Sequence, residues 1–315
     1  MTFDGIFVQL KEIMIKSAFS AVWSRPKMLF LIYGVGFVLA MLVARPFYVT
    51  FLNEADTSVA LDALLKDFDF MIFSDFINQS GDAFKPLFSL IFVIGIVYLF
   101  LSNFFDGGIL QVIKNKEFTF ADFFAGGSKL FGKFLMLLLY SLIFLLVLVA
   151  FSGMFFFIFA SIGEGGSEKT YFFVMLPPIA ILTYFFSVVI VQNMYAKVMM
   201  SQKDDLGPWE AFGKAFGYIM KRPVTFLLFW GVLFVGFLLL LVYLGIDSLT
   251  QMSTSITIFM MFLVQQVPVL ARTFLKIFNL TLARAFFDTN PISLEKRVKL
   301  EPNTDLEDDS VVRVE

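Results

Sequence analysis

The chain has 315 residues, of which 59% are hydrophobic and 16% are charged, and its formal net charge is −2. A soluble domain carries about 25% charged residues, so this composition predicts an integral membrane protein and gives no indication of nucleic-acid binding. Cysteine and histidine are both absent, which excludes disulfides, thiolate nucleophiles, imidazole bases and imidazole metal ligands. We therefore expect no metal site and no cofactor.

Six stretches are long and apolar enough to cross a membrane, which takes about 20 residues at 1.5 Å per residue. In chain order they are Met28 to Ala44, Pro86 to Phe105, Phe134 to Ala160, Tyr171 to Tyr195, Val224 to Ile246, and Ser253 to Leu270 or beyond. The third would form about 40 Å of helix, so we expect it to tilt or to protrude from the membrane. The sequence predicts an all-α fold, a polytopic bundle of six transmembrane helices.

Basic residues are concentrated in the N-terminal segment, the second and fourth connections and the C-terminal segment, whereas the first connection is acidic. Because cytoplasmic loops carry an excess of Lys and Arg, both termini are predicted to be cytoplasmic, in a bacterial inner membrane. Residues 1–288 are expected to form the six-span domain. Residues 289–315, which end in EPNTDLEDDSVVRVE, are expected to form a disordered cytoplasmic tail.

One phrase occurs twice in the chain. SAFSAVWSRPKMLF at 17–30 and KAFGYIMKRPVTF at 214–226 both place Ala-Phe seven residues before Arg-Pro, and an apolar run follows. Proline is tolerated in the first turn of a helix and disfavours helix at the residue before it, so Arg-Pro predicts an elbow between an amphipathic interfacial helix and a span. Arg25 and Arg222 are predicted to reach the headgroups of membrane lipids.

A weaker third copy, TFADFFAGGSKLFGK, precedes the third span, and its Thr119 and Asp122 have the spacing of a capping box. The chain is thus interpreted as three repeat units, about 1–105, 118–196 and 206–288, each an interfacial helix followed by a two-span hairpin. The alternative is that multispan proteins commonly place basic residues and proline before their helices.

The segments DGGILQVIKNKEFTFADFFAGG at 106–127 and GPWEAFGKAFGYIMKRP at 207–223 give the chain a likeness to a known group. It resembles the six-span bacterial families of unknown function related to the membrane domain of some glycerophosphodiester phosphodiesterases. These families are similar in having a glycine-rich exit from span two and an amphipathic helix before span five. The shared segments carry no catalytic residue and no phosphodiesterase domain is present, so the resemblance implies no hydrolysis.

Span six contains Gln265 and Gln266 within an apolar run, and Pro268 removes a backbone donor. Something must satisfy the carbonyl that this proline leaves free, and a wet cavity is one solution. The two glutamines either line a substrate path or join helices by polar contacts worth about 0.6 kcal/mol each.

Span four contains the pair Pro177 and Pro178, which predicts a kink. Such a kink is either structural or the kind of broken helix found at transporter sites. Gln192 and Asn193 near the inner end of this span are expected to pair with span six.

No Asp, Glu, Lys or Arg falls near the middle of a predicted span, which disfavours an ion-coupled pump. Asp106, Arg45, Asp247 and Arg272 fall near span ends and are expected to be interfacial anchors. Arg272 and Lys276 are one turn apart and are predicted to bind an anionic lipid headgroup.

Two hypotheses of function follow. The first is an accessory or membrane-organising protein without catalytic activity, which grips membrane lipids and meets a membrane protein partner. The alternative is a passive or lipid-handling transporter or channel with a cavity between spans four and six. An intramembrane enzyme is disfavoured because the chain lacks His, Cys and paired carboxylates within its spans.

Overall fold

The structure is a computed structural model that describes residues 3–55, 69–250 and 255–294. Within these ranges it contains helices and no strands, so the predicted all-α fold is confirmed. The helices are α1 (Phe3–Trp23), α2 (Pro26–Ala55), α4 (Phe70–Gln79), α5 (Gly81–Asn115), α6 (Phe120–Gly163), α7 (Glu168–Gln202), α8 (Pro208–Met220), α9 (Val224–Leu249) and α10 (Ser255–Thr289). Most of the predicted tail, residues 295–315, lies outside the described residues.

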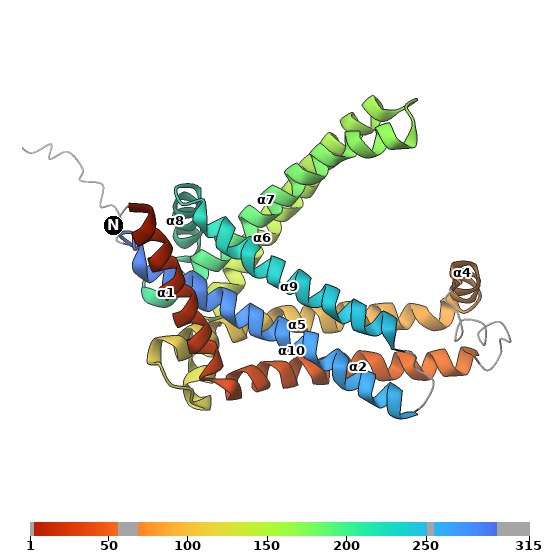
Figure 1. Ribbon diagram of the computed structural model, residues 1–315, viewed down its shortest axis with the longest axis horizontal. Coiled ribbons are helices and arrows are strands. Elements are labelled where there is room, and N and C mark those ends of the chain that lie inside the picture. Colours follow the sequence, from red (N-terminus) through yellow and green to blue (C-terminus); the bar gives the residue numbers. More distant parts are fainter. Residues whose placement is uncertain (1–2, 56–68, 251–254, 295–315) are drawn as a thin grey trace, which may run out of the picture.

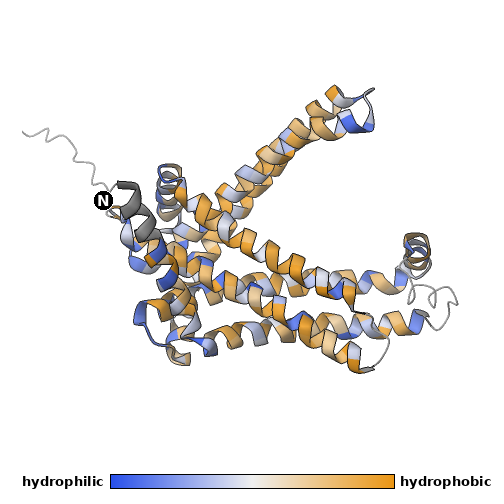
Figure 2. Cartoon of the chain, in the orientation of Figure 1, coloured by the Kyte–Doolittle hydropathy of each residue, from blue (hydrophilic) through white to orange (hydrophobic). Residues whose placement is uncertain are grey.

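Six of these helices, α2, α5, α6, α7, α9 and α10, are long and apolar enough to span a membrane, as predicted. Hydrophobic residues predominate along these helices in Figure 2, and many of their large hydrophobic side chains are exposed. Lipid would cover such a surface, because exposed apolar patches of this extent are not found on soluble monomers. The chain is therefore a multi-pass membrane protein.

The spans are arranged in two groups (Figure 1). Helices α2, α5, α9 and α10 run alongside one another, whereas the hairpin of α6 and α7 leaves the others at an angle. Helices α1 and α8 and the α5–α6 connection gather at one end of the molecule, and α4 lies at the other. Basic residues are concentrated at the end that carries α1 and α8, so this end is the one predicted to be cytoplasmic.

Each Arg-Pro pair separates two helices at the position where an elbow was predicted. Helix α1 ends at Trp23 and α2 begins at Pro26, and α8 ends at Met220 shortly before α9 begins at Val224. The physical reason is the one inferred from the sequence: proline lacks the N–H that would continue the preceding helix and suits the first turn of the next.

The third copy of the phrase behaves differently. Thr119 caps α6 as predicted, since its hydroxyl accepts from the backbone N–H of Asp122 at 3.0 Å and donates to the Asp122 carboxylate at 2.7 Å. The separate interfacial helix predicted before span three is wrong, because α6 runs unbroken for 44 residues. No proline occurs between Phe120 and Gly163, so nothing removes a backbone donor there.

Four glycines bring α5 and α6 into close contact. A Cβ atom on Gly126 would lie 2.2 Å from the Cβ of Gln111, and one on Gly107 would lie 2.9 Å from the carbonyl oxygen of Gly126. Gly108 and Gly127 are equally crowded, by Phe123 and Phe104 respectively. Small residues of this kind allow two membrane helices to pack backbone against backbone. This contact fixes the stretch of α5 that begins at Asp106.

The packing of the helices follows a cyclic order around the three predicted units. The first helix of each unit contacts the second span of the unit before it: α6 packs on α5, α8 on α7, and α1 on α10. The second spans α5, α7 and α10 also contact one another. The threefold repeat stays a prediction, and this order is an argument for it. The three second spans meet at the centre, where polar side chains collect.

Candidate functional site

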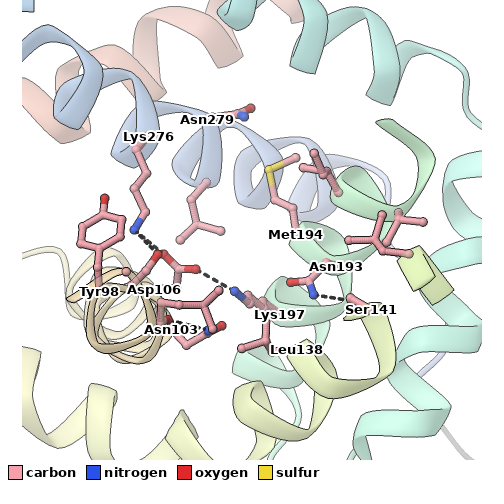
Figure 3. A pocket seen from close by; sticks show the side chains of 17 residues that line it. Tyr98, Asn103, Asp106, Leu138, Ser141, Asn193, Met194, Lys197, Lys276 and Asn279 are labelled. Carbon is pink, nitrogen blue, oxygen red and sulfur yellow. Dashed lines mark hydrogen bonds and ion pairs between the residues drawn. The ribbon is translucent and has the colours of Figure 1, made fainter. Parts of the chain in front are cut away.

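A cavity of about 460 Å³ lies between α5, α6, α7 and α10. Figure 3 shows its side chains converging from these helices. Apolar and polar residues share the lining of the cavity. The polar lining consists of Tyr98, Ser102, Asn103, Asp106, Ser141, Asn193, Lys197, Lys276 and Asn279.

Three charged side chains form the floor of the cavity, one from each second span. The Asp106 carboxylate on α5 accepts from the Lys197 ammonium on α7 at 2.8 Å. Its other oxygen lies 3.5 Å from the ammonium of Lys276 on α10, which also donates to the Ser102 hydroxyl at 2.7 Å. We call Asp106, Lys197 and Lys276 the floor triad. It ties the three central helices together.

The floor triad is largely withdrawn from solvent and is not electrically neutral. The side chains of Lys197 and Asp106 are 10% and 12% exposed, and Lys276 is 29% exposed. Lys197 also lies over the ring of Phe134, 5.6 Å from its centroid. Two ammonium groups share one carboxylate, which leaves a net charge of +1. Because a buried charge is costly unless it is paired, this surplus favours an anion in the cavity.

One face of α5 runs from the mouth of the cavity to its floor. Gly95, Tyr98 and Leu99 are exposed, whereas Asn103 and Asp106 are buried. The spacing of three or four residues places all of them on one side of the helix. The mouth is therefore at the level of the apolar spans and the floor lies deeper, toward the end of the molecule predicted to be cytoplasmic. A lipid could enter sideways from the membrane.

The two polar residues predicted in span four do not pair with span six, so that expectation is wrong. Gln192 donates to the carbonyl of Phe212 in α8 at 2.9 Å, and Asn193 donates to the Ser141 hydroxyl in α6 at 2.6 Å. Both make interhelical contacts, and only Asn193 lines the cavity. The reason is the hairpin: α6 and α8 flank α7 at this level, so the side chains reach these neighbours first.

The glutamines and prolines of the predicted path lie away from the floor triad. Gln266 accepts from the hydroxyl of Tyr33 in α2 at 2.8 Å, which is a contact between spans. Gln265 is half-buried, and its side chain makes no hydrogen bond within the described part of the chain. Pro268 borders a second cavity, of about 500 Å³ between α9 and α10.

Pro177 and Pro178 lie inside α7, which continues through both of them as a helix. Pro178 is buried and borders an apolar cavity of about 360 Å³ between α6 and α7. Pro177 is exposed. This cavity contains only Ser152 as a polar residue, whose hydroxyl donates to the carbonyl of Leu148.

The four basic residues predicted to bind headgroups lie in different surroundings. Arg25 is buried, and its guanidinium donates to the carbonyls of Ala21 and, at 2.6 Å, of Lys116. Burial lowers the pKa of Arg25 from its ordinary value. Arg222 lies over the ring of Tyr218, 4.4 Å from its centroid.

Arg272 is exposed and borders the cavity between α9 and α10. Lys276 borders both that cavity and the one above the floor triad. Of the four predicted headgroup residues, only Lys276 belongs to the floor triad.

Sequence reasoning missed Asp106 and Lys197 as members of a site. Asp106 was expected to be an interfacial anchor at the end of span two, but its side chain is 12% exposed and pairs with two lysines, and α5 continues for nine residues beyond it, to Asn115. Lys197 lies beyond the predicted end of span four at Tyr195, but α7 continues to Gln202. One pattern in the sequence could have indicated the site: Ser102, Asn103 and Asp106 have the spacing of one helix face at the inner end of span two.

Within the described residues no cluster of His, Cys, Asp and Glu could hold a metal ion. Comparison of the chain with models of protein families, with curated proteins and with solved structures finds no match. The likeness to six-span families therefore stays a prediction, and the function is argued from the cavity and its floor triad.

Proposed function

We propose that this chain is a non-catalytic membrane protein that binds an anionic lipid in the cavity above the floor triad. The observation that carries the proposal is the buried carboxylate of Asp106 shared between two ammonium groups, with apolar walls above them. The cavity suits an amphiphile, because a negatively charged headgroup would contact the floor triad and a hydrocarbon chain would contact the apolar walls.

The charge of the site argues for a single anionic group. With Asp106 ionised, the floor triad carries +1, so one phosphodiester or carboxylate would neutralise it. Lys276 is the group that would contact the anion, because it is the most exposed of the three side chains and has only a 3.5 Å approach to Asp106. Lys197, at 2.8 Å, would remain paired with the carboxylate.

The position of the cavity argues for a lipid rather than a water-soluble anion. Its rim on α5 is exposed at the level where the spans carry apolar surface. Its walls are built from Leu138, Leu145, Val189 and Ile190 among other apolar side chains. A membrane lipid could reach this rim directly from the bilayer, without passing through water. The role supported best is therefore lipid handling in a bacterial inner membrane, with the headgroup toward the cytoplasmic side.

A titration of the purified protein with phosphatidylmethanol and with phosphatidylcholine, followed by native mass spectrometry, tests this proposal. Phosphatidylmethanol is an anionic phosphodiester, whereas phosphatidylcholine is zwitterionic. We expect the anionic lipid to bind more tightly and Lys276→Gln to weaken its binding by about tenfold or more, because a charge-assisted hydrogen bond contributes about 1.5–3 kcal/mol.

The matched control is Lys129→Gln, the same change at an exposed ion pair with Asp204 on the surface. It should leave lipid binding unchanged. Equal binding of the two lipids by the wild type, or equal losses in the two variants, would show that basic surface residues and not the cavity attract lipid.

A further inference from the structure

Asn103 is a buried polar residue on the floor of the cavity, and its side-chain amide is only partly hydrogen-bonded. The residue is 3% exposed, and its side-chain nitrogen donates to the carbonyl of Leu99 at 3.0 Å. Its side-chain oxygen is buried and has no hydrogen-bond partner among the described residues. Because a carbonyl can only accept, the nitrogen must face Leu99, and the orphan group must be the acceptor.

No other donor that lines the cavity bonds this oxygen. Lys197 donates to Asp106, Lys276 to Ser102, and Asn193 to Ser141. Figure 3 shows Tyr98 and Asn279 pointing away from Asn103. Buried acceptors in native proteins are nearly always satisfied, by protein, by ligand or by ordered water. A donor from the bound molecule would satisfy this one.

We infer that the headgroup of the bound lipid carries a hydroxyl group, and that Asn103 selects it by accepting its hydrogen bond. This inference rests on the proposed function and deepens it, since Asn103 lies beside Asp106 on the face of α5 that lines the cavity. A hydroxyl fits better than an ammonium group, because a further positive charge would lie next to Lys197 and Lys276. The ligand is thus an anionic phospholipid with a hydroxylated headgroup.

A comparison of phosphatidylglycerol with phosphatidylmethanol isolates the hydroxyl. The two lipids carry the same charge and can be made with the same acyl chains, and only the first has free hydroxyl groups. Each is titrated into the purified full-length protein and bound lipid is counted by native mass spectrometry. We expect the wild type to prefer phosphatidylglycerol by about fivefold, the factor that one net hydrogen bond supplies.

The variant Asn103→Leu removes the acceptor and should abolish the preference for phosphatidylglycerol over phosphatidylmethanol. Asn115→Leu is the matched control, because Asn115 is the exposed last residue of α5 and lies outside the cavity. It should keep the preference of the wild type. The comparison of lipids on the wild type alone also tests the inference, in case the variant fails to fold.

Each outcome distinguishes the inference from the proposed function. If the wild type binds both anionic lipids equally and both more tightly than phosphatidylcholine, the hydroxyl is not recognised and the inference is wrong, while the proposed function stands. If Asn103→Leu keeps the preference, the hydroxyl is recognised by another residue, and the assignment of Asn103 is wrong. If neither anionic lipid binds more tightly than phosphatidylcholine, the proposed function itself is wrong.

Discussion

Replacing Asp106 by Asn tests the floor triad most directly. Asn keeps the size and most of the hydrogen-bonding capacity of Asp but leaves Lys197, whose side chain is 10% exposed, without a counter-charge. Removing one partner of a buried ion pair costs about 3–5 kcal/mol. In a chain of 315 residues each kcal/mol lowers the unfolding midpoint by about 2 °C, so we expect a decrease of about 6–10 °C.

The assay is thermal unfolding of the purified protein in phosphatidylcholine nanodiscs, with and without added phosphatidylglycerol. The variant carries +2 on its floor, so the anionic lipid should restore part of the lost stability. Binding at a concentration of 100 times the dissociation constant returns about 2.7 kcal/mol, or about 5 °C. Asp204→Asn is the control, since Asp204 forms an exposed pair with Lys129 and should show no measurable change.

Two results would refute this reasoning in different ways. An unchanged midpoint in Asp106→Asn would mean that the ion pair is not formed in the membrane. A decrease that anionic lipid does not reverse would mean that the floor triad only joins helices, and that its surplus charge binds no lipid.

Three further predictions concern contacts outside the cavity. Gly126→Ala should lower the free energy of unfolding by about 1–3 kcal/mol, because it overpacks α5 against α6. Gly132→Ala, in open space on α6, should raise the free energy of unfolding by about 0.5–1 kcal/mol. Thermal unfolding of both variants tests this, and changes of equal sign would contradict the close contact. Gln266→Leu removes a hydrogen bond between spans and should lower the free energy of unfolding by about 0.6 kcal/mol without changing lipid binding. A loss of lipid binding would indicate that Gln266 lines a substrate path. Arg25→Gln should destabilise the protein by about 1.5–3 kcal/mol, because the buried guanidinium donates to two carbonyls. Arg222→Gln should destabilise it by about 0.5–1 kcal/mol, because this guanidinium lies over the ring of Tyr218. Equal decreases in the unfolding midpoint would show that the two arginines of the repeated phrase make equivalent contributions to stability.

The membrane spans and elbows could be predicted because they depend on local chemistry. About 20 apolar residues form a span, and proline suits the first turn of a helix, as at Pro26 and Pro208. The cap by Thr119 was predictable for the same reason. The unbroken α6 was not predicted, because an amphipathic pattern before a span does not reveal whether the helix ends between the two.

The site could be predicted only in part, because it depends on how far helices extend beyond the apolar residues. Hydropathy ends span two at Phe105, yet α5 continues through ten more residues as far as Asn115. Lys276 was singled out as a basic residue one turn from Arg272, but its partner Asp106 is 170 residues away in sequence and belongs to another helix. No periodicity within one helix indicates which charges on other helices face it.

The elbow at Arg25 has a consequence for the order of assembly during synthesis. Its guanidinium donates to the carbonyl of Lys116, which is 91 residues further along the chain. At about 5–20 residues per second, the ribosome needs about 5–18 s to produce that partner. Until then we expect the charged side chain to stay hydrated at the membrane surface, which keeps the first span from docking. Once the second span has been inserted, the nascent chain can close this contact and bury the arginine.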